Sequence, residues 1–263
     1  MRLLDLVSSG AALLGRGAQD SKRAASFVRQ TLRGNRIAPS GAWKPFDKHH
    51  LVLLIHGYLA TRGSLHLLES RLSHMGHLVL TYRLGVLHLG DICESAAKIA
   101  TKIESIAAQT NLDRMDIVGH SMGGLVGLYY VKCMGGRRRV RKLVMLGTPT
   151  SGTWSALLGV GLSPLGRAGL QLLPDSAFLR SLDEGQLPEG VDIVSISGQR
   201  DLLAPPSTTR VRGVRHISLP TNHAGLLVDE GVARIVGDLL AEPMVAATER
   251  FEVPIHQNLT SSG

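Results

Sequence analysis

One serine stands in a sequence context that can make it a nucleophile. The hexapeptide GHSMGG occupies residues 119–124, with Ser121 at the centre of a G-x-S-x-G pattern. It follows the apolar run 115–118, typical of a buried strand, and precedes the apolar run 125–131, typical of a buried helix. In such a tight strand-to-helix turn, the helix N-terminus directs its amides and its dipole toward a developing oxyanion. The pattern predicts that Ser121 is a hydrolytic nucleophile.

An acid and a histidine follow in the chain order that this kind of site uses. Asp201 lies in the loop after the β-branched run 191–197, and His223 lies in the loop after the run 214–219. Sites in open α/β sheets gather just beyond the carboxyl ends of strands. We therefore predict a catalytic triad of Ser121, Asp201 and His223.

Each of these assignments has a rival. Asp201 would also suit an ordinary turn paired with Arg200, and His223 would also suit a helix cap. His216 competes with His223, but it lies inside a strand run rather than beyond it. The competing acids lie near the start of a strand or in a different segment: Asp175, Asp183 and Asp192.

A second oxyanion donor is expected from an earlier loop. Residues 51–55 are all apolar, as in a strand buried on both faces, and His56, Gly57 and Tyr58 follow. Gly57 permits a sharp departure from the strand, so the backbone amides of Tyr58 and Met122 are the predicted oxyanion hole. The alternative is a connecting loop with a structural glycine.

With HGY at 56–58, GHSMGG at 119–124 and GTP at 147–149, the chain resembles the α/β-hydrolase superfamily, and more narrowly bacterial triacylglycerol lipases and esterases. Residues 174–182 are similar to a cap segment of these lipases, and the resemblance covers about residues 50 to 240. The resemblance implies that the protein cleaves the carboxylic ester bonds of small-molecule acyl esters or lipids through an acyl-enzyme, without a cofactor. An acyltransferase or thioesterase with the same triad, or a non-catalytic hydrolase-like binding protein, are the alternatives.

The chain departs from these lipases at two places. Thr150 and Ser151 follow the GTP segment, where such lipases often carry His and Gly. Some members bind calcium through aspartates near the histidine loop, but only Asp229 lies nearby here, so no calcium or other metal is assigned.

Strands and helices alternate in the pattern of a mostly parallel sheet covered by helices on both faces. Strands are expected at 51–55, 78–82, 114–118, 142–146, 191–197 and 214–219. Helices are expected near 64–74, near 92–108, directly after the serine turn, and near 226–240. The predicted organisation is an N-terminal basic amphipathic helical segment (1–40), an α/β-hydrolase domain (41–241) and a C-terminal extension (242–263).

An apolar, glycine-rich insertion over about 150–188 is predicted to form a helical cap beside the site. Four of its side chains are expected to line an acyl pocket: Leu157, Leu162, Leu172 and Phe178. The alternative is a pair of ordinary helices packed on the core.

Charge and composition narrow the classes of partner. The net charge of +8 could suggest nucleic acid, but aromatic residues make up only 4% of the chain, so base stacking is not supported. The basic cluster 137–142 is interpreted as a solvated turn, with attraction to anionic lipid as the alternative. Cys93 and Cys133 have no metal-like spacing and are interpreted as small buried hydrophobes, with one disulfide left open.

Residues 21–33 have the pattern of a basic amphipathic helix, which either packs on the domain or contacts a membrane surface. The longest apolar run near the start is 11–14, too short for a signal peptide or a membrane span. The expected location is therefore cytoplasmic or peripheral to a membrane.

Overall fold

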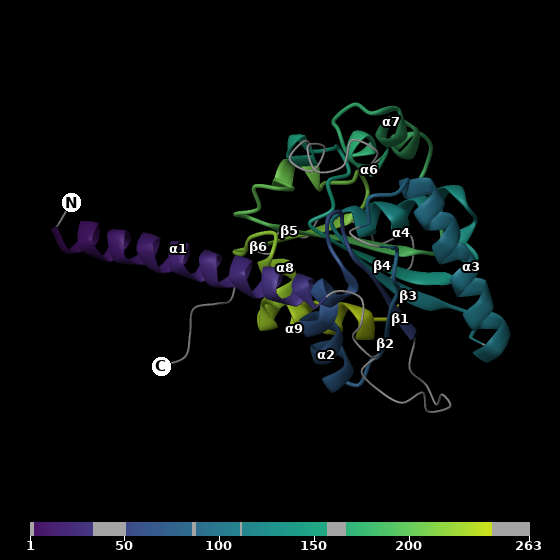
Figure 1. Cartoon of the computed structure of the whole chain (residues 1–263), viewed down its shortest axis with the longest axis horizontal. Coiled ribbons are helices and arrows are strands. Elements are labelled where there is room, and N and C mark those ends of the chain that lie inside the picture. Colours follow the sequence, from purple (N-terminus) through teal and green to yellow (C-terminus); the bar gives the residue numbers. More distant parts are fainter. Residues whose placement is uncertain (1–2, 34–50, 86–87, 111, 157–166, 244–263) are drawn as a thin grey trace.

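A six-stranded parallel sheet forms the centre of the molecule (Figure 1). The structure, a computed structural model, describes residues 3–33, 51–85, 88–110, 112–156 and 167–243, with side chains from Gly17 onward. The spatial order of the strands is β2-β1-β3-β4-β5-β6, and every neighbouring pair is parallel. The strands are β1 (Leu51–Ile55), β2 (Leu78–Thr81), β3 (Met115–His120), β4 (Val140–Leu146), β5 (Asp192–Gly198) and β6 (Arg215–Leu219).

Side chains alternate along each strand, so each strand contributes to one core on either face of the sheet. Different helices cover these two faces. Leu51, Leu53 and Ile55 of β1 belong to the core on one face, whereas Val52 and Leu54 belong to the core on the other. The first face is covered by α3 (Ile92–Thr110), α4 (Met122–Cys133), α6 (Arg167–Gln171) and α7 (Ala177–Asp183). The second is covered by α2 (His66–His74), α8 (Gly225–Val228) and α9 (Glu230–Ala241). The predicted fold class, a parallel sheet covered on both faces, is confirmed.

Short 3₁₀ helices join several of these elements. They are η1 (Arg62–Leu65), η2 (Gly136–Arg138), η3 (Trp154–Ala156) and η4 (Pro206–Thr208). Within the predicted cap, η3, α6 and α7 are described, whereas residues 157–166 lie outside the described part of the chain. The C-terminal extension is described only as far as Pro243.

Helix α1 (Leu3–Leu32) lies within the helical segment predicted for residues 1–40 and extends beyond residues 21–33, where the amphipathic pattern is clear. Its first turns project beyond the body of the molecule (Figure 1). Its later turns pack against η1 and α8. This second half therefore lies on the domain.

The predicted helix near 226–240 is two helices, because the chain is extended at Asp229 (φ −80°, ψ 135°). The Asp229 carboxylate accepts hydrogen bonds from Arg23 and Thr221 instead of capping the first turn of α9. A contact with α1 thus accompanies the break.

The basic cluster 137–142 is not a solvated turn throughout. β4 begins at Val140, two residues before the predicted start, and Arg141 and Lys142 are buried within it. Arg141 donates to both oxygens of Asp116, and Lys142 Nζ lies 3.0 Å from Asp192 Oδ2. The interpretation was wrong for these two residues because their distant acidic partners, at the starts of β3 and β5, compensate their charges.

Removing the buried acid should cost much of the stability of the fold. Asp116→Ala leaves the Arg141 guanidinium without its carboxylate, and breaking a buried pair in this way typically costs about 3–5 kcal/mol. Urea unfolding followed by circular dichroism measures the loss. Glu104→Ala, which removes the exposed partner of Arg139, is the matched control and should cost less than about 1 kcal/mol. Equal losses in the two variants would contradict the argument.

Both cysteines are free thiols. Cys93 is partly buried, but Cys133, at the end of α4, is exposed. The interpretation of Cys133 as a buried hydrophobe was therefore wrong, since the last turn of α4 buries Tyr130 and Val131 in the core and leaves Cys133 exposed.

Candidate active site

Ser121 occupies a strained turn between β3 and α4. Its backbone has φ 53° and ψ −127°, a conformation that L-residues rarely adopt. The flanking glycines allow other backbone to approach closely. A Cβ on Gly119 would lie 2.5 Å from the Gly124 backbone, and one on Gly123 would lie 2.3 Å from the Ile55 carbonyl oxygen. The sequence therefore folds here into the sharp turn that exposes a serine at the start of a helix.

The loop after β1 lies directly against this turn. A Cβ on Gly57 would come within 2.8 Å of Ser121 Cβ, so only glycine permits the approach. The next residue is Tyr58, and Met122 is the first residue of α4, where helix amides have no carbonyl partner within the helix. The two amides proposed as oxyanion donors thus belong to segments packed on either side of Ser121. Their role stays a prediction.

Asp201 and His223 are joined by a hydrogen bond of 2.7 Å between Oδ2 of the acid and Nδ1 of the ring. The carboxylate is 2% exposed, and its other oxygen accepts from the amides of Leu203 (2.9 Å) and Ala204 (2.7 Å). All of these bonds hold the carboxylate in one orientation. The acid therefore fixes His223 with Nδ1 as the donor, which leaves Nε2 as the basic nitrogen.

The loops that carry these three residues meet at the carboxyl edge of the sheet. Ser121 N donates to the Leu146 carbonyl (2.8 Å), and a Cβ on Gly147 would lie 3.1 Å from both Asp201 Oδ2 and His223 Nδ1. The His120 ring lies 4.5 Å, centroid to centroid, from the His223 ring. Among the described residues, Ser121 Oγ has no hydrogen bond to His223, and such catalytic bonds often tighten only when substrate binds.

The rival residues lie elsewhere. Asp192 is the first residue of β5, near the start of the strand as predicted, and it pairs with Lys142. His216 lies inside β6, and its Nε2 is 3.1 Å from Ser197 Oγ. Asp175 and Asp183 border α7 in the cap.

Three buried histidines lie in or near the turn that carries Ser121, and none of them was assigned a role from the sequence. His56, His88 and His120 are each at most 2% exposed. Burial lowers the pKa of His56 to about 4 and, together with the charge of His56, that of His88 to about 3. Burial and the neighbouring His223 also lower the pKa of His120. With eleven histidines in the chain, nothing in the sequence marked His88, whose Nδ1 donates to the His56 carbonyl (2.9 Å).

These buried neutral rings predict a loss of stability in mild acid. In the unfolded chain the rings take up protons below about pH 6.5, whereas folded His56 and His88 stay neutral down to about pH 4 and about pH 3. The unfolded state binds more protons in this window, so stability falls as pH falls, by about 1.4 kcal/mol per pH unit for each ring.

Urea unfolding at pH 7 and pH 5 measures the effect. The wild type should be less stable at pH 5, and His88→Gln should reduce the difference by roughly 2 kcal/mol. His74→Gln, which alters an exposed histidine, is the control and should leave the difference unchanged. A wild type equally stable at both pH values would contradict the prediction.

The predicted cap residues divide into two groups. Leu157 and Leu162 lie outside the described residues. Leu172 and Phe178, which belong to the insertion itself, are buried in the core on the α4 face of the sheet, and the Phe178 ring lies 5.8 Å, centroid to centroid, from the ring of Tyr129 on α4. Contact of these four side chains with an acyl chain stays a prediction.

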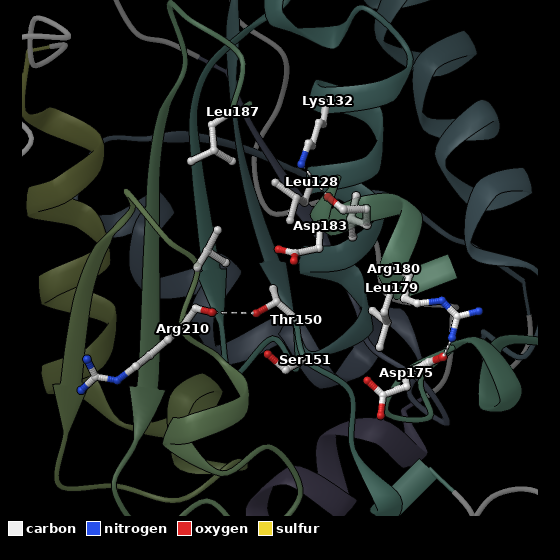
Figure 2. Close-up of a pocket in the computed structure, with 12 residues that line it drawn as sticks. Leu128, Lys132, Thr150, Ser151, Asp175, Leu179, Arg180, Asp183, Leu187 and Arg210 are labelled. Atoms are coloured by element: carbon white, nitrogen blue, oxygen red, sulfur yellow. Dashed lines mark hydrogen bonds between the residues drawn. The ribbon is translucent and has the colours of Figure 1, made fainter. Parts of the chain in front are cut away.

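A pocket of about 210 Å³ opens between α4, α7 and the loop before β6 (Figure 2). Its lining includes Leu128, Leu179 and Val211 together with charged Lys132 and Asp183. None of the predicted triad, oxyanion or acyl-binding residues described above lines it. It is a separate hollow between α4 and α7.

Comparisons with known proteins agree with this architecture. A family model described as "Alpha/beta hydrolase of unknown function (DUF915)" matches residues 89–202, less than half of the chain. The Bacillus licheniformis lipase BlEst2 in its propeptide form superposes with a TM-score of 0.68 at 14% identity, over 80% of this chain and 54% of that one. The chain has the α/β-hydrolase fold.

Two further solved structures show the same hydrolase fold. Aspergillus fumigatus lipase B has a TM-score of 0.66 at 17% identity, covering 79% of this chain and 58% of its own. The enol-lactonase of Burkholderia xenovorans LB400 has a TM-score of 0.56 at 17% identity, covering 74% of this chain and 93% of its own. The chain thus spans little more than half the length of the two lipase structures. A comparison with curated protein sequences finds no significant match.

Two further properties of this chain concern membranes and metals. Within the described ranges, none of the helices combines the length and the apolar character needed to span a bilayer. In the same part of the chain, no three His, Cys, Asp or Glu side chains gather in a way that could bind a metal ion.

Proposed function

We propose that this α/β-hydrolase is a serine hydrolase that cleaves carboxylic esters of acyl compounds or lipids. The observation that carries the proposal is the 2.7 Å bond between Asp201 and His223, held at the sheet edge where Ser121 occupies its strained turn. The structurally similar proteins support the substrate class, because they include proteins described as lipases and an enol-lactonase.

The proposed reaction runs through an acyl-enzyme. Ser121 Oγ attacks the ester carbonyl carbon while His223 Nε2 takes the hydroxyl proton, and Asp201 stabilises the resulting imidazolium. The amides of Tyr58 and Met122 donate to the oxyanion. As the tetrahedral intermediate collapses, the bond to the alcohol breaks and His223 returns the proton to that alcohol. A water molecule, deprotonated by His223, then attacks the carbonyl carbon of the acyl-enzyme. The bond to Ser121 Oγ breaks, His223 returns the proton to Oγ, and the acid is released.

A fluorophosphonate probe tests the nucleophile directly, because it forms a covalent bond only with an activated serine. We expect stoichiometric labelling of the wild type, with the modified peptide containing Ser121. Ser151→Ala, which removes an exposed serine in the loop after β4, is the control and should label normally. Absence of labelling in folded wild-type protein would contradict the proposal.

The predicted acyl pocket makes a claim about chain length. Each additional methylene that is buried contributes up to about 0.8 kcal/mol, or about fourfold in kcat/KM. For p-nitrophenyl esters, kcat/KM should therefore rise from acetate to at least hexanoate. Leu162→Asp should flatten that rise more than it lowers activity on acetate.

Leu170→Asp is the matched control, because Leu170 on α6 is 59% exposed and should not contact the acyl chain. The rise should persist in this variant. A profile that peaks at acetate in the wild type would leave a hydrolase of small esters, with a cap that serves only as scaffold.

A further inference from the structure

Helix α1 contacts a residue adjacent in sequence to each member of the proposed triad. The Asp20 carboxylate binds the guanidinium of Arg200, which precedes Asp201. The Asp20 carbonyl lies 3.5 Å from the side-chain amide of Asn222, which precedes His223. Figure 1 shows that α1 passes α8 near β6, the edge strand of the sheet.

The same helix also contacts the residue before the serine. The Phe27 ring lies 6.2 Å from the ring of His120, which in turn packs against His223. One helix therefore contacts three loops that are far apart in the sequence and that carry the three reacting side chains.

Four charged residues make the strongest of these contacts, and we call them the α1 ion-pair network: Asp20, Arg23, Arg200 and Asp229. Asp20 accepts two bonds from Arg200 (2.9 and 3.1 Å) and one from Arg23 (2.7 Å). Arg23 also binds both oxygens of Asp229 (2.9 and 2.7 Å). The bond from Arg200 is the main reason why the pKa of Asp20 is below its ordinary value, so this carboxylate stays charged.

The network joins the acid loop to the histidine loop. Arg200 N donates to the Thr221 carbonyl (3.0 Å), and Thr221 Oγ1 donates to Asp229 Oδ2 (2.6 Å). Thr221 is 2% exposed and lies two residues before His223. A ring of bonds that passes through α1 therefore connects the loop that carries Asp201 with the loop that carries His223.

An isolated surface ion pair would not support a functional role, because such pairs contribute little to the stability of the fold. This network differs in two respects. Its paired bonds between guanidinium and carboxylate fix direction as well as distance, and the Arg23 side chain is only 9% exposed. Neither property is needed merely to keep a helix attached to the surface.

We propose that α1 is a positioning element for the triad: through Asp20, Arg23, Arg200 and Asp229 it holds the acid and histidine loops in the register that lets Asp201 orient His223. The inference rests on the proposed function. None of the four residues is a catalytic residue, since each acts through a neighbour.

Arg23→Met tests the proposal in the full chain, because methionine keeps most of the side-chain volume and removes both sets of ion pairs. We expect kcat for a p-nitrophenyl ester to fall about ten- to hundredfold, while KM stays within about twofold, since misplacing a catalytic group by about 1 Å can cost that much. Lys22→Met, at the exposed neighbouring position on the same helix, should match the wild type.

A second readout does not depend on turnover. The Nδ1 proton of His223, hydrogen-bonded to Asp201, should give a low-field proton resonance that His223→Ala removes and thereby assigns. In Arg23→Met the resonance should broaden or disappear, although circular dichroism remains that of the folded protein. If the wild type shows the resonance but no esterase activity, the proposed function fails and this readout alone decides the role of α1.

Arg200→Met and Arg200→Lys give an independent test from the other side of the network, and they decide the question if Arg23→Met does not fold. Arg200→Met should lose kcat and the resonance as Arg23→Met does, whereas Arg200→Lys should recover part of both by keeping the charge beside Asp20. The proposal would be overturned if both methionine variants kept the wild-type kcat and an unchanged resonance. If Arg23→Met does not fold, the same result in Arg200→Met alone would overturn it.

Discussion

Ser121→Ala is expected to lower kcat for p-nitrophenyl esters by about 10⁵- to 10⁶-fold, as loss of a triad nucleophile does in a serine protease. Without Oγ no acyl-enzyme can form, and His223 has no hydroxyl proton to accept. Alanine fits the strained turn as serine does, because it adds no atom beyond Cβ. The fold should therefore be unchanged.

Steady-state kinetics on purified protein measure the loss, and circular dichroism checks the fold. The exposed Ser151→Ala variant should keep the wild-type rate and controls for handling. More than a few per cent of wild-type activity in clean Ser121→Ala protein would mean that Ser121 is not the nucleophile.

His223→Ala should reduce kcat by a comparable factor, since removing the base alone costs about as much as removing the whole triad. The reason is structural: Nδ1 of His223 is bound to the buried Asp201, so only this ring can act as a base oriented by that acid. The loss should appear in kcat rather than in KM.

His216→Ala is the matched comparison, seven residues earlier on β6. Its ring contacts Ser197 on the neighbouring strand and has no bond to Asp201 among the described residues, so we expect activity within a few fold of wild type. The opposite pattern in folded variants would transfer the role of base to His216.

The strands and the turn that carries Ser121 were predictable because the sequence patterns that indicate them are local. Apolar runs such as 51–55 define a strand buried on both faces, and the glycine spacing around Ser121 is a local motif, although the contacts that require Gly123 and Gly124 come from Ile55 and Thr148. The positions of Asp201 and His223 followed from a topological rule, that loops after parallel strands meet at one edge.

Features that depend on distant partners were not predictable in the same way. Lys142 lies in a basic run, and its burial is possible because its ammonium pairs with Asp192, fifty residues later, and donates to the carbonyl of Leu239 on α9. The break at Asp229 and the docking of α1 have the same origin. His88 is of this kind too, because its partners lie on another loop and another helix.

The sequence distance between α1 and its partners sets an order of events during synthesis. Arg23 and Asp229 are 206 positions apart, and Asp20 and Arg200 are 180 apart. A nascent chain made from its amino end carries α1 long before the ribosome has produced either partner, and contacts of such long range form late. Freshly released molecules should therefore complete their sheet first and gain full turnover only when this early-made helix docks.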